Sequence, residues 1–224
     1  MEFVPWFSLP AGSAPYYAFI CAPGFGLTFC FAAAMALAAH ADTFTFKPAD
    51  ADMGDLDHHY AYTWGISWNL PAGTEITGAT LSIKNIWDWK AGERNQLYID
   101  LLDNTSTGIK TYLDNTNDNV LSDYFAGKGV ALTIFEDNVG GVARNNNFAY
   151  SFTSDQLSTL TSYITNRHTV GKADFGISFD PDCHYFNDGI TLTITTQRVP
   201  DGGLTMVFFG LGLLAVSSLR RIIS

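Results

Sequence analysis

The sequence predicts a mostly β protein. We expect an antiparallel β-sandwich or jelly roll with one short helix, preceded by an N-terminal signal helix and followed by a C-terminal transmembrane helix. Three observations predict this: apolar and polar residues alternate with a period of two through most of the chain, turn-rich stretches separate the alternating runs, and a charge-poor apolar segment stands near each end. The aromatic content of 14% excludes a disordered chain.

Residues 1–41 have the features of a secretory signal peptide. They contain no Lys or Arg, include the apolar run 25–37 and end in Ala39-His40-Ala41. Small residues at the third and first positions before the scissile bond are what signal peptidase requires, so we expect cleavage after Ala41. The usual positive n-region is missing, which leaves the true start open. A buried N-terminal helix is the alternative interpretation.

The body, residues 42–198, carries the strand pattern. In residues 60–70 the even positions are aromatic or aliphatic and the odd positions are small or polar, which predicts a strand with one buried face. Similar runs occur at 79–83, 97–101, 130–134, 148–152, 175–179 and 190–194. Seven or eight strands without intervening helices imply an antiparallel arrangement.

One segment of the body has helical spacing instead. Thr153 and Gln156 have the spacing of a capping box, and Leu157, Leu160 and Ile164 follow at helical intervals. We therefore expect a short helix across one end of the sandwich.

Two acidic strings are candidate Ca²⁺ sites, because clustered oxygen ligands near a glycine turn suit a hard cation. The candidate ligands are Asp50, Asp52, Asp55 and Asp57 in the first string, and Asp180, Asp182 and Asp188 in the second. The two strings would come together if the first and last strands pair. A solvated acidic loop and a simple hairpin turn are the alternatives.

Two pairs of tryptophans call for different interpretations. Trp64 and Trp68 share the apolar face of a predicted strand, so we expect both in the core. Trp87 and Trp89 flank an aspartate in more polar surroundings and would form a platform for sugar rings if exposed on one face. Capping of the sandwich edge is the alternative for this second pair.

The common catalytic motifs are absent from the sequence. It contains no Gly-x-Ser-x-Gly, no His-Glu-x-x-His and no phosphate-binding glycine loop. Cys183 and His184 are adjacent, so on a strand they would point to opposite faces and could not form a dyad. Cys183 is also the one cysteine left after signal cleavage, which excludes an intramolecular disulfide in the mature chain. We expect a body that is not an enzyme.

The C-terminal segment 199–224 has three parts. Val199-Pro200-Asp201-Gly202-Gly203 is followed by the apolar residues 204–219 and then by Arg220-Arg221. Residues 202–219 carry no charge, and as a helix they would span roughly 27 Å, close to the hydrocarbon thickness of about 30 Å. We expect a transmembrane helix with the arginines on the cytoplasmic side and the body outside. A buried core helix is the alternative.

This tail resembles the PEP-CTERM protein-sorting signal in its VPDGG variant. The resemblance implies recognition by an exosortase, a membrane cysteine protease, and transfer of the protein to the cell surface or extracellular matrix. Asp201 stands where Glu is usual in the family, which leaves the exosortase subtype open. The body is also similar in general layout to the carbohydrate-binding-like sandwich domains common in PEP-CTERM proteins.

The charge distribution argues against one class of function, nucleic-acid binding. The only charged side chains outside the body are Glu2, Asp201 and the two terminal arginines, so the net charge of −10 belongs to the body. No basic surplus exists to bind nucleic acid. We expect an exported, membrane-anchored or surface protein whose body binds polysaccharide or matrix polymer. The alternative is a secreted carbohydrate hydrolase with dispersed carboxylates.

Overall fold

The structure, a computed structural model, describes residues 41–90, 95–114, 122–137, 139–141, 146–166 and 170–199. Eleven strands and one helix lie in these residues. The strands are β1 (Ala41–Phe46), β2 (Tyr60–Ile66), β3 (Thr74–Ile83), β4 (Trp87–Asp88), β5 (Gln96–Leu102), β6 (Gly108–Leu113), β7 (Gly129–Glu136), β8 (Phe148–Ser151), β9 (Phe175–Pro181), β10 (Tyr185–Phe186) and β11 (Ile190–Arg198). The helix is α1 (Ser154–Thr165).

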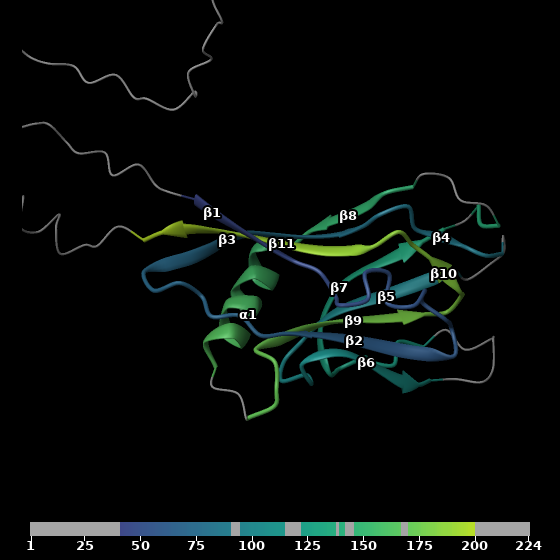
Figure 1. The fold of residues 1–224 in the computed structure, drawn as a ribbon, viewed down its shortest axis with the longest axis horizontal. Coiled ribbons are helices and arrows are strands. Elements are labelled where there is room, and N and C mark those ends of the chain that lie inside the picture. Colours follow the sequence, from purple (N-terminus) through teal and green to yellow (C-terminus); the bar gives the residue numbers. More distant parts are fainter. Residues whose placement is uncertain are drawn as a thin grey trace, which may run out of the picture. The chain divides into compact units, whose positions relative to one another are not determined.

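The predicted mostly β, antiparallel architecture is confirmed. A four-stranded sheet in the order β1-β11-β3-β8 faces a five-stranded sheet in the order β6-β2-β9-β5-β7, an arrangement consistent with a β-sandwich (Figure 1). Four of the pairings are nested along the chain, namely β1 with β11, β2 with β9, β3 with β8 and β5 with β7. In each of these pairs a strand from the later part of the chain therefore lies antiparallel beside a strand from the earlier part.

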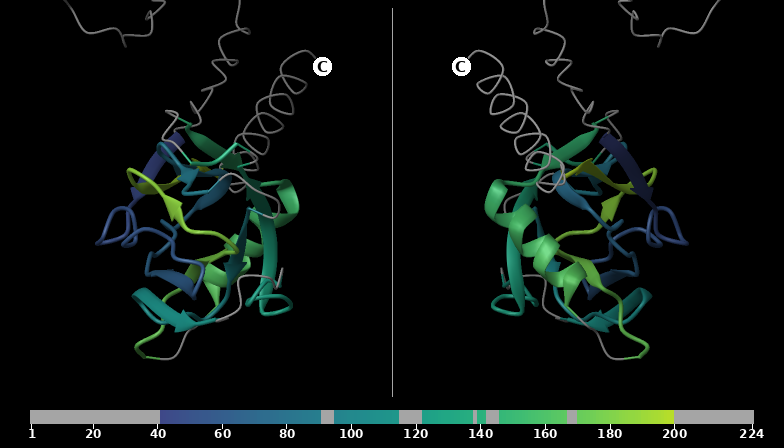
Figure 2. Two further views of the ribbon diagram at one scale, coloured as in Figure 1. Left: turned by 90° about the vertical axis from the view of Figure 1, so that its right-hand side faces the viewer. Right: turned by 90° about the vertical axis from the view of Figure 1, so that its left-hand side faces the viewer.

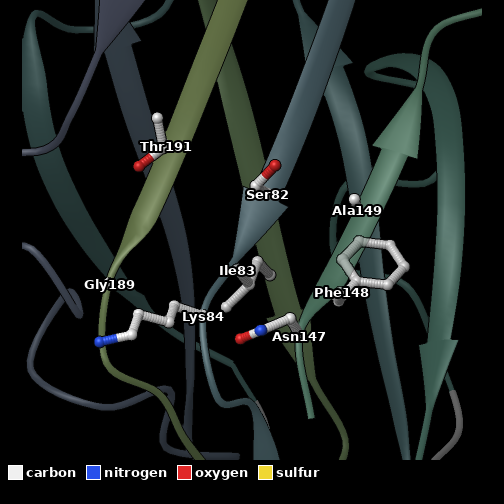
Figure 3. A pocket seen from close by; sticks show the side chains of 8 residues that line it. All are labelled: Ser82, Ile83, Lys84, Asn147, Phe148, Ala149, Gly189 and Thr191. Carbon is white, nitrogen blue, oxygen red and sulfur yellow. The ribbon is translucent and has the colours of Figure 1, made fainter. Parts of the chain in front are cut away.

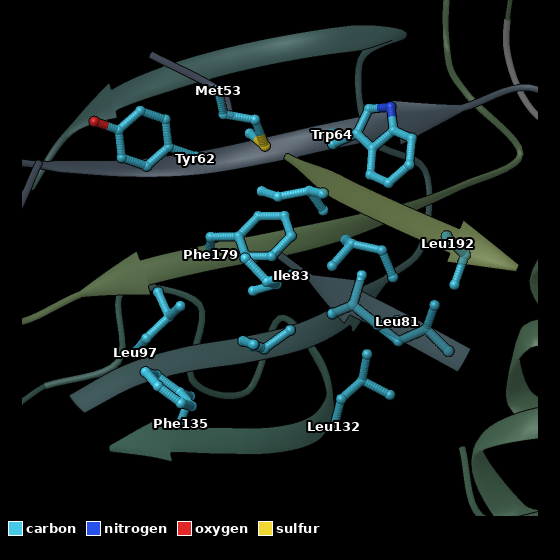
Figure 4. Close-up of a cluster of buried hydrophobic side chains, with 14 of the residues drawn as sticks. Met53, Tyr62, Trp64, Leu81, Ile83, Leu97, Leu132, Phe135, Phe179 and Leu192 are labelled. Atoms are coloured by element: carbon cyan, nitrogen blue, oxygen red, sulfur yellow. The ribbon is translucent and has the colours of Figure 1, made fainter. Parts of the chain in front are cut away.

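The core lies between the two sheets (Figure 4). Leu81 and Ile83 of β3 meet Leu97 of β5 and Phe179 of β9 in one cluster of buried side chains, and all four are fully buried. Burying each such side chain contributes roughly 1.5–3 kcal/mol. Trp64 belongs to this cluster, as expected, whereas Trp68 follows the end of β2 and packs half-buried against Phe44 and Phe46 of β1.

The prediction of one buried face for the strand at residues 60–70 is wrong. β2 ends at Ile66, and Ala61, Thr63 and Gly65 on its second face are buried as well. Ala61 packs there with Leu102 and Phe125 in a second, smaller cluster. Both faces are covered because β2 is an inner strand and the segment containing Phe125 lies across its outer side.

The expected alternation in residues 130–134 breaks at a β-bulge. Ile99 pairs with Thr133 but Asp100 pairs with Ala131, so Leu132 is an extra residue in β7. Leu132 and Phe135 are buried, whereas Ile134 is 48% exposed. The sequence pattern placed Ile134 on the buried face, and the bulge turns it outward.

The predicted helix and its capping box are confirmed. The Thr153 hydroxyl accepts from the backbone N–H of Gln156, and the Gln156 side chain accepts from the backbone N–H of Thr153. Leu160 and Ile164 are buried. Figure 2 (right) faces the end of the sandwich where α1 lies, between a strand of each sheet, β3 and β9.

Most residues of the predicted signal and tail lie outside the described residues. Ala41 is the first residue of β1 and pairs with Gln197, whereas Ala39 is not described. Val199 donates its backbone N–H to the carbonyl of Gly73 at 2.9 Å. The residues not described are Pro200, Asp201, Gly202, Gly203, the predicted span 204–219, Arg220 and Arg221. Within the part of the chain that is described, no helix has the length and apolar character needed to cross a membrane.

Candidate functional site

A short ribbon of β4 and β10 lies at the end of the sandwich opposite α1 (Figures 1 and 2). Tyr185 pairs with Asp88 and Phe186 with Trp87 in antiparallel register. The backbone N–H of Trp89 donates to the carbonyl of His184 at 3.1 Å, which extends the pairing by one residue. Two 2.9 Å backbone hydrogen bonds between Leu56 and Tyr185 tie the ribbon to the loop between β1 and β2.

One face of this ribbon is aromatic. Trp87 and Trp89 alternate with the buried Asp88, and His184 and Phe186 alternate with the buried Tyr185, so the four rings lie on the same side. Trp87 stacks on Phe186 with centroids 4.5 Å apart and planes at 28°, and His184 lies 4.7 Å from Phe186. Trp89 is 55% exposed and the other three rings are half-buried. We call these four residues the aromatic platform.

The opposite face of the ribbon is buried and polar. Asp88 and Tyr185 are both fully buried, and neither carboxylate oxygen of Asp88 nor the Tyr185 hydroxyl has a hydrogen-bond partner within the described part of the chain. Burial, with the nearby charge of Asp137, raises the pKa of Asp88 to about 6. Asp137 accepts from the backbone N–H of Asp88 at 3.3 Å and of Val139 at 3.1 Å. The platform therefore rests on a desolvated carboxyl group that takes up a proton at a higher pH than an aspartate in water does.

The first candidate calcium string forms the loop between β1 and β2. Because β1 and β11 do pair, this loop contacts the segment before β11. The side-chain amide of Asn187 donates to the backbone carbonyl of Asp52 at 2.9 Å. The backbone N–H of Asn187 donates to the Asp55 carboxylate at 3.4 Å. The Asp52 carboxylate instead accepts from Gly54 at 2.8 Å. Repulsion by Asp52 and Asp55 adds to desolvation in raising the pKa of Asp50.

Asp57 lies in a different environment. Its carboxylate is 2.9 Å from Nδ1 of His59 and 3.5 Å from Nδ1 of His58. Desolvation acts to raise the pKa of Asp57, but hydrogen bonds from the backbone and ring of His59 lower it overall. Among the described residues, these three form the only group of three or more potential metal-ligand side chains with ligand atoms within 4.8 Å of one another. Three ligands with two imidazoles suit Zn²⁺ better than Ca²⁺ but are one short of a structural tetrahedral set.

The second candidate calcium string is divided by the fold. Asp188 forms an ion pair with Lys84 at 3.7 Å. Asp180 alternates with inward-facing residues of β9 and lies on the outer face of the five-stranded sheet, where its carboxylate accepts from the backbone N–H of Tyr124 at 2.6 Å. Burial raises the pKa values of Asp180 and Asp182 to about 7, with further contributions from neighbouring aspartates.

Cys183 is buried and free. Burial, with the nearby Asp88 charge, raises the pKa of its thiol above the ordinary value. A neutral thiol in this setting is the opposite of an activated nucleophile.

A shallow depression of about 270 Å³ lies on the outer face of the four-stranded sheet (Figure 3). Its labelled side chains, among them Ser82, Lys84, Asn147 and Thr191, are spread along β3, β8 and the start of β11. Lys84 is already paired with Asp188. This depression lacks the convergent polar groups that would orient a ligand.

Comparison with protein-family models finds no family that matches the chain, and no curated protein matches it either. The site is therefore defined by its own geometry.

Sequence reasoning identified half of the aromatic platform. It singled out Trp87 and Trp89 but missed His184 and Phe186, which the ribbon places across from them. The signal was present in the sequence, because both segments have aromatic rings two residues apart around a single residue. Only the pairing of β4 with β10 shows that the two segments share one face.

Proposed function

We propose that this protein is an exported surface or matrix component whose body binds polysaccharide through the aromatic platform, without catalysing a reaction. The exposed Trp89 ring beside the stacked rings of Trp87 and Phe186 is the observation that supports it. Sugar rings present C–H groups that pack against aromatic faces, while their hydroxyls bond to polar groups alongside. Lys90, the residue after Trp89, is exposed and supplies a charged group close to the platform.

The binding experiment uses the full chain, purified in detergent, against immobilised neutral and acidic polysaccharides. Trp89→Ala removes an exposed ring with little effect on folding, and we expect roughly tenfold weaker binding because one ring contact contributes about 1.4 kcal/mol. Tyr60→Ala is the matched control, since it removes an aromatic ring that is 39% exposed and belongs to β2 rather than to the platform. Equal binding by the parent and Trp89→Ala would contradict the proposal. Release of reducing ends, lost in Asp182→Asn, would instead favour the hydrolase.

The second part of the proposal is that the protein is exported and sorted by its tail. The positions of the first and last strands support it. β11 finishes at Arg198, and Val199 makes its hydrogen bond to Gly73, so a cut beyond Val199 would leave both sheets intact. Likewise, cleavage after Ala41 would remove a single residue of β1. The tail as an exosortase substrate with a membrane helix remains a proposal based on its residues.

Intact mass and location test this sorting. The parent is expected outside the cell and trimmed at both ends, whereas a variant with Pro200-Asp201 replaced by Ala-Ala is expected in the membrane at higher mass. If both proteins have the same mass and both stay in the membrane, the tail is a simple membrane anchor and the sorting proposal is wrong.

We also assign the finer topology of a jelly roll. The four nested pairs β1–β11, β2–β9, β3–β8 and β5–β7 behave as one long antiparallel ribbon that is rolled up so that β11 joins β3 and β9 joins β5. β6 is then an added edge strand, and β4 with β10 is an added ribbon at one end.

A further inference from the structure

A second pocket lies on the outer face of the five-stranded sheet, away from the aromatic platform. Its volume is about 250 Å³. Pockets for drug-sized ligands occupy roughly 300–1,000 Å³, so this one suits a single ring. One wall is the loop after β5, containing Thr105 and Ser106, and the other is formed by Tyr112 of β6 and the segment around Tyr124.

The loop wall depends on two glycines. A side chain at Gly65 would collide with the backbone of Ser106, and one at Gly176 would come within 2.6 Å of the Thr105 hydroxyl. Without these side chains the loop lies directly on β2 and β9. The Ser106–Lys172 bridge then fixes Lys172 at the rim.

The floor of the pocket holds an unsatisfied polar group. Thr63 of β2 is 2% exposed, and its hydroxyl has no hydrogen-bond partner among the described residues. A buried hydroxyl without a partner costs about 1–3 kcal/mol. A ligand hydroxyl at this position would recover that cost.

The other wall is aromatic. Tyr112 and Tyr124 stack with centroids 5.9 Å apart and planes at 28°, and Phe125 packs edge-on against both. This wall offers an apolar surface with phenol hydroxyls.

The rim is more basic than the protein as a whole. Lys128 lies with its Nζ 3.9 Å from the centroid of the Tyr124 ring, and Lys172 lines the same pocket. Asp103 is the acidic side chain that also lines it. The charged side chains that line the pocket are thus two lysines and one aspartate, on a protein of net charge −10.

We propose that this pocket binds a uronic acid residue of an acidic polysaccharide. The sugar ring packs against Tyr112 and Tyr124, its carboxylate lies between Lys128 and Lys172, and a ring hydroxyl bonds to Thr63. The site is separate from the aromatic platform and does not require it.

Oligogalacturonate and its methyl ester are matched probes, because they share one ring and differ in charge. With the full chain in detergent we expect roughly tenfold tighter binding of the acid than of the ester, and a preference that falls as salt rises. Lys128→Ala and Lys172→Ala should each remove most of this preference. Lys47→Ala is the matched control, because it deletes an exposed lysine that follows β1 of the other sheet. Thr63→Val should weaken both probes equally.

Three outcomes would overturn the proposal. Equal binding of acid and ester by the parent would remove the role of the lysines, as would an unchanged preference in both lysine variants. Displacement of the oligomer by inorganic phosphate as readily as by galacturonate would reduce the pocket to a simple anion site. Loss of acid binding in Trp89→Ala would move the ligand to the platform. Conversely, lysine-dependent acid binding together with no effect of Trp89→Ala on any polysaccharide would retain the pocket and reject the platform.

Discussion

At the scale of single residues, the buried carboxyl group beneath the platform is the most unusual feature. Asp88 is fully buried, its carboxylate oxygens lack partners among the described residues, and its pKa is raised to about 6. In the unfolded chain an aspartate titrates near 3.9. Between these two values the folded state holds more protons than the unfolded state, so stability falls as pH rises.

Asp88→Asn should remove this part of the pH dependence. Stability from Asp88 is fully present below about pH 4 and is lost as pH rises through about 6, with a total near 3 kcal/mol. The difference in the free energy of unfolding between pH 4.5 and pH 8 should therefore shrink in the variant, as measured by urea denaturation. Glu75→Gln, at an exposed carboxylate, is the control. An unchanged difference in Asp88→Asn would show that folding does not raise the pKa of this carboxyl group.

At the scale of elements, the side chain of Gln156 links α1 to the sheets by hydrogen bonds, in addition to the apolar packing of Leu160 and Ile164. Gln156 completes the capping box, and its side-chain amide also donates to the carbonyls of Ala131 at 3.0 Å and Leu132 at 3.3 Å. Its carbonyl accepts from the Tyr150 hydroxyl at 2.9 Å. The same glutamine thus caps the helix and satisfies the backbone of β7 where the bulge disturbs it.

Gln156→Ala should therefore cost more stability than Thr153→Ala. Loss of the Thr153 cap removes about 1 kcal/mol. Loss of Gln156 leaves buried groups of β7 and β8 without partners as well, which brings the total to roughly 2–3 kcal/mol. Chemical denaturation measures both, with Ser158→Ala at an exposed position of α1 as a control. Equal costs for Gln156 and Thr153 would mean that the β7 contacts contribute nothing.

At the scale of the whole molecule, several carboxylates share the behaviour of Asp88. Burial raises the pKa values of Asp100 to about 6 and of Asp180 and Asp182 to about 7, with neighbouring aspartates adding to the effect. All have folded-state pKa values above their unfolded values. Each contributes stability at acidic pH that is lost as pH rises from about 4 to about 7.

The melting temperature should therefore be higher at pH 5 than at pH 8. The calcium hypothesis adds that Ca²⁺ restores stability at pH 8, because a bound cation favours the charged carboxylates. Thermal melts at both pH values, with Ca²⁺ or with a chelator, measure this. Asp57→Asn tests the first candidate calcium string and Asp182→Asn the second. Loss of the Ca²⁺ effect in one variant assigns the site to that string. A melting temperature insensitive to Ca²⁺ at pH 8 would contradict the hypothesis for both.

The sequence by itself determined what depends on near neighbours. The period-two runs predicted the strands β2, β3, β5, β7, β8, β9 and β11, and the Thr153–Gln156 spacing predicted α1 with its cap. These features are local, because strand alternation and capping each involve residues a few positions apart. The prediction missed β4 and β10 because each has only two residues. It missed β1 and β6 because each has only two apolar side chains in alternation on one face.

Only the tertiary structure decided which faces are covered and which side chains meet. The bulge at Leu132 exposes Ile134, the segment around Phe125 buries the second face of β2, and the pairing of β4 with β10 brings His184 and Phe186 beside the two tryptophans. The pocket above Thr63 likewise joins residues from β2, β6 and two loops. These outcomes depend on pairings between segments far apart in the chain, such as β1 with β11, and a local pattern of apolar and polar residues carries no information about such partners.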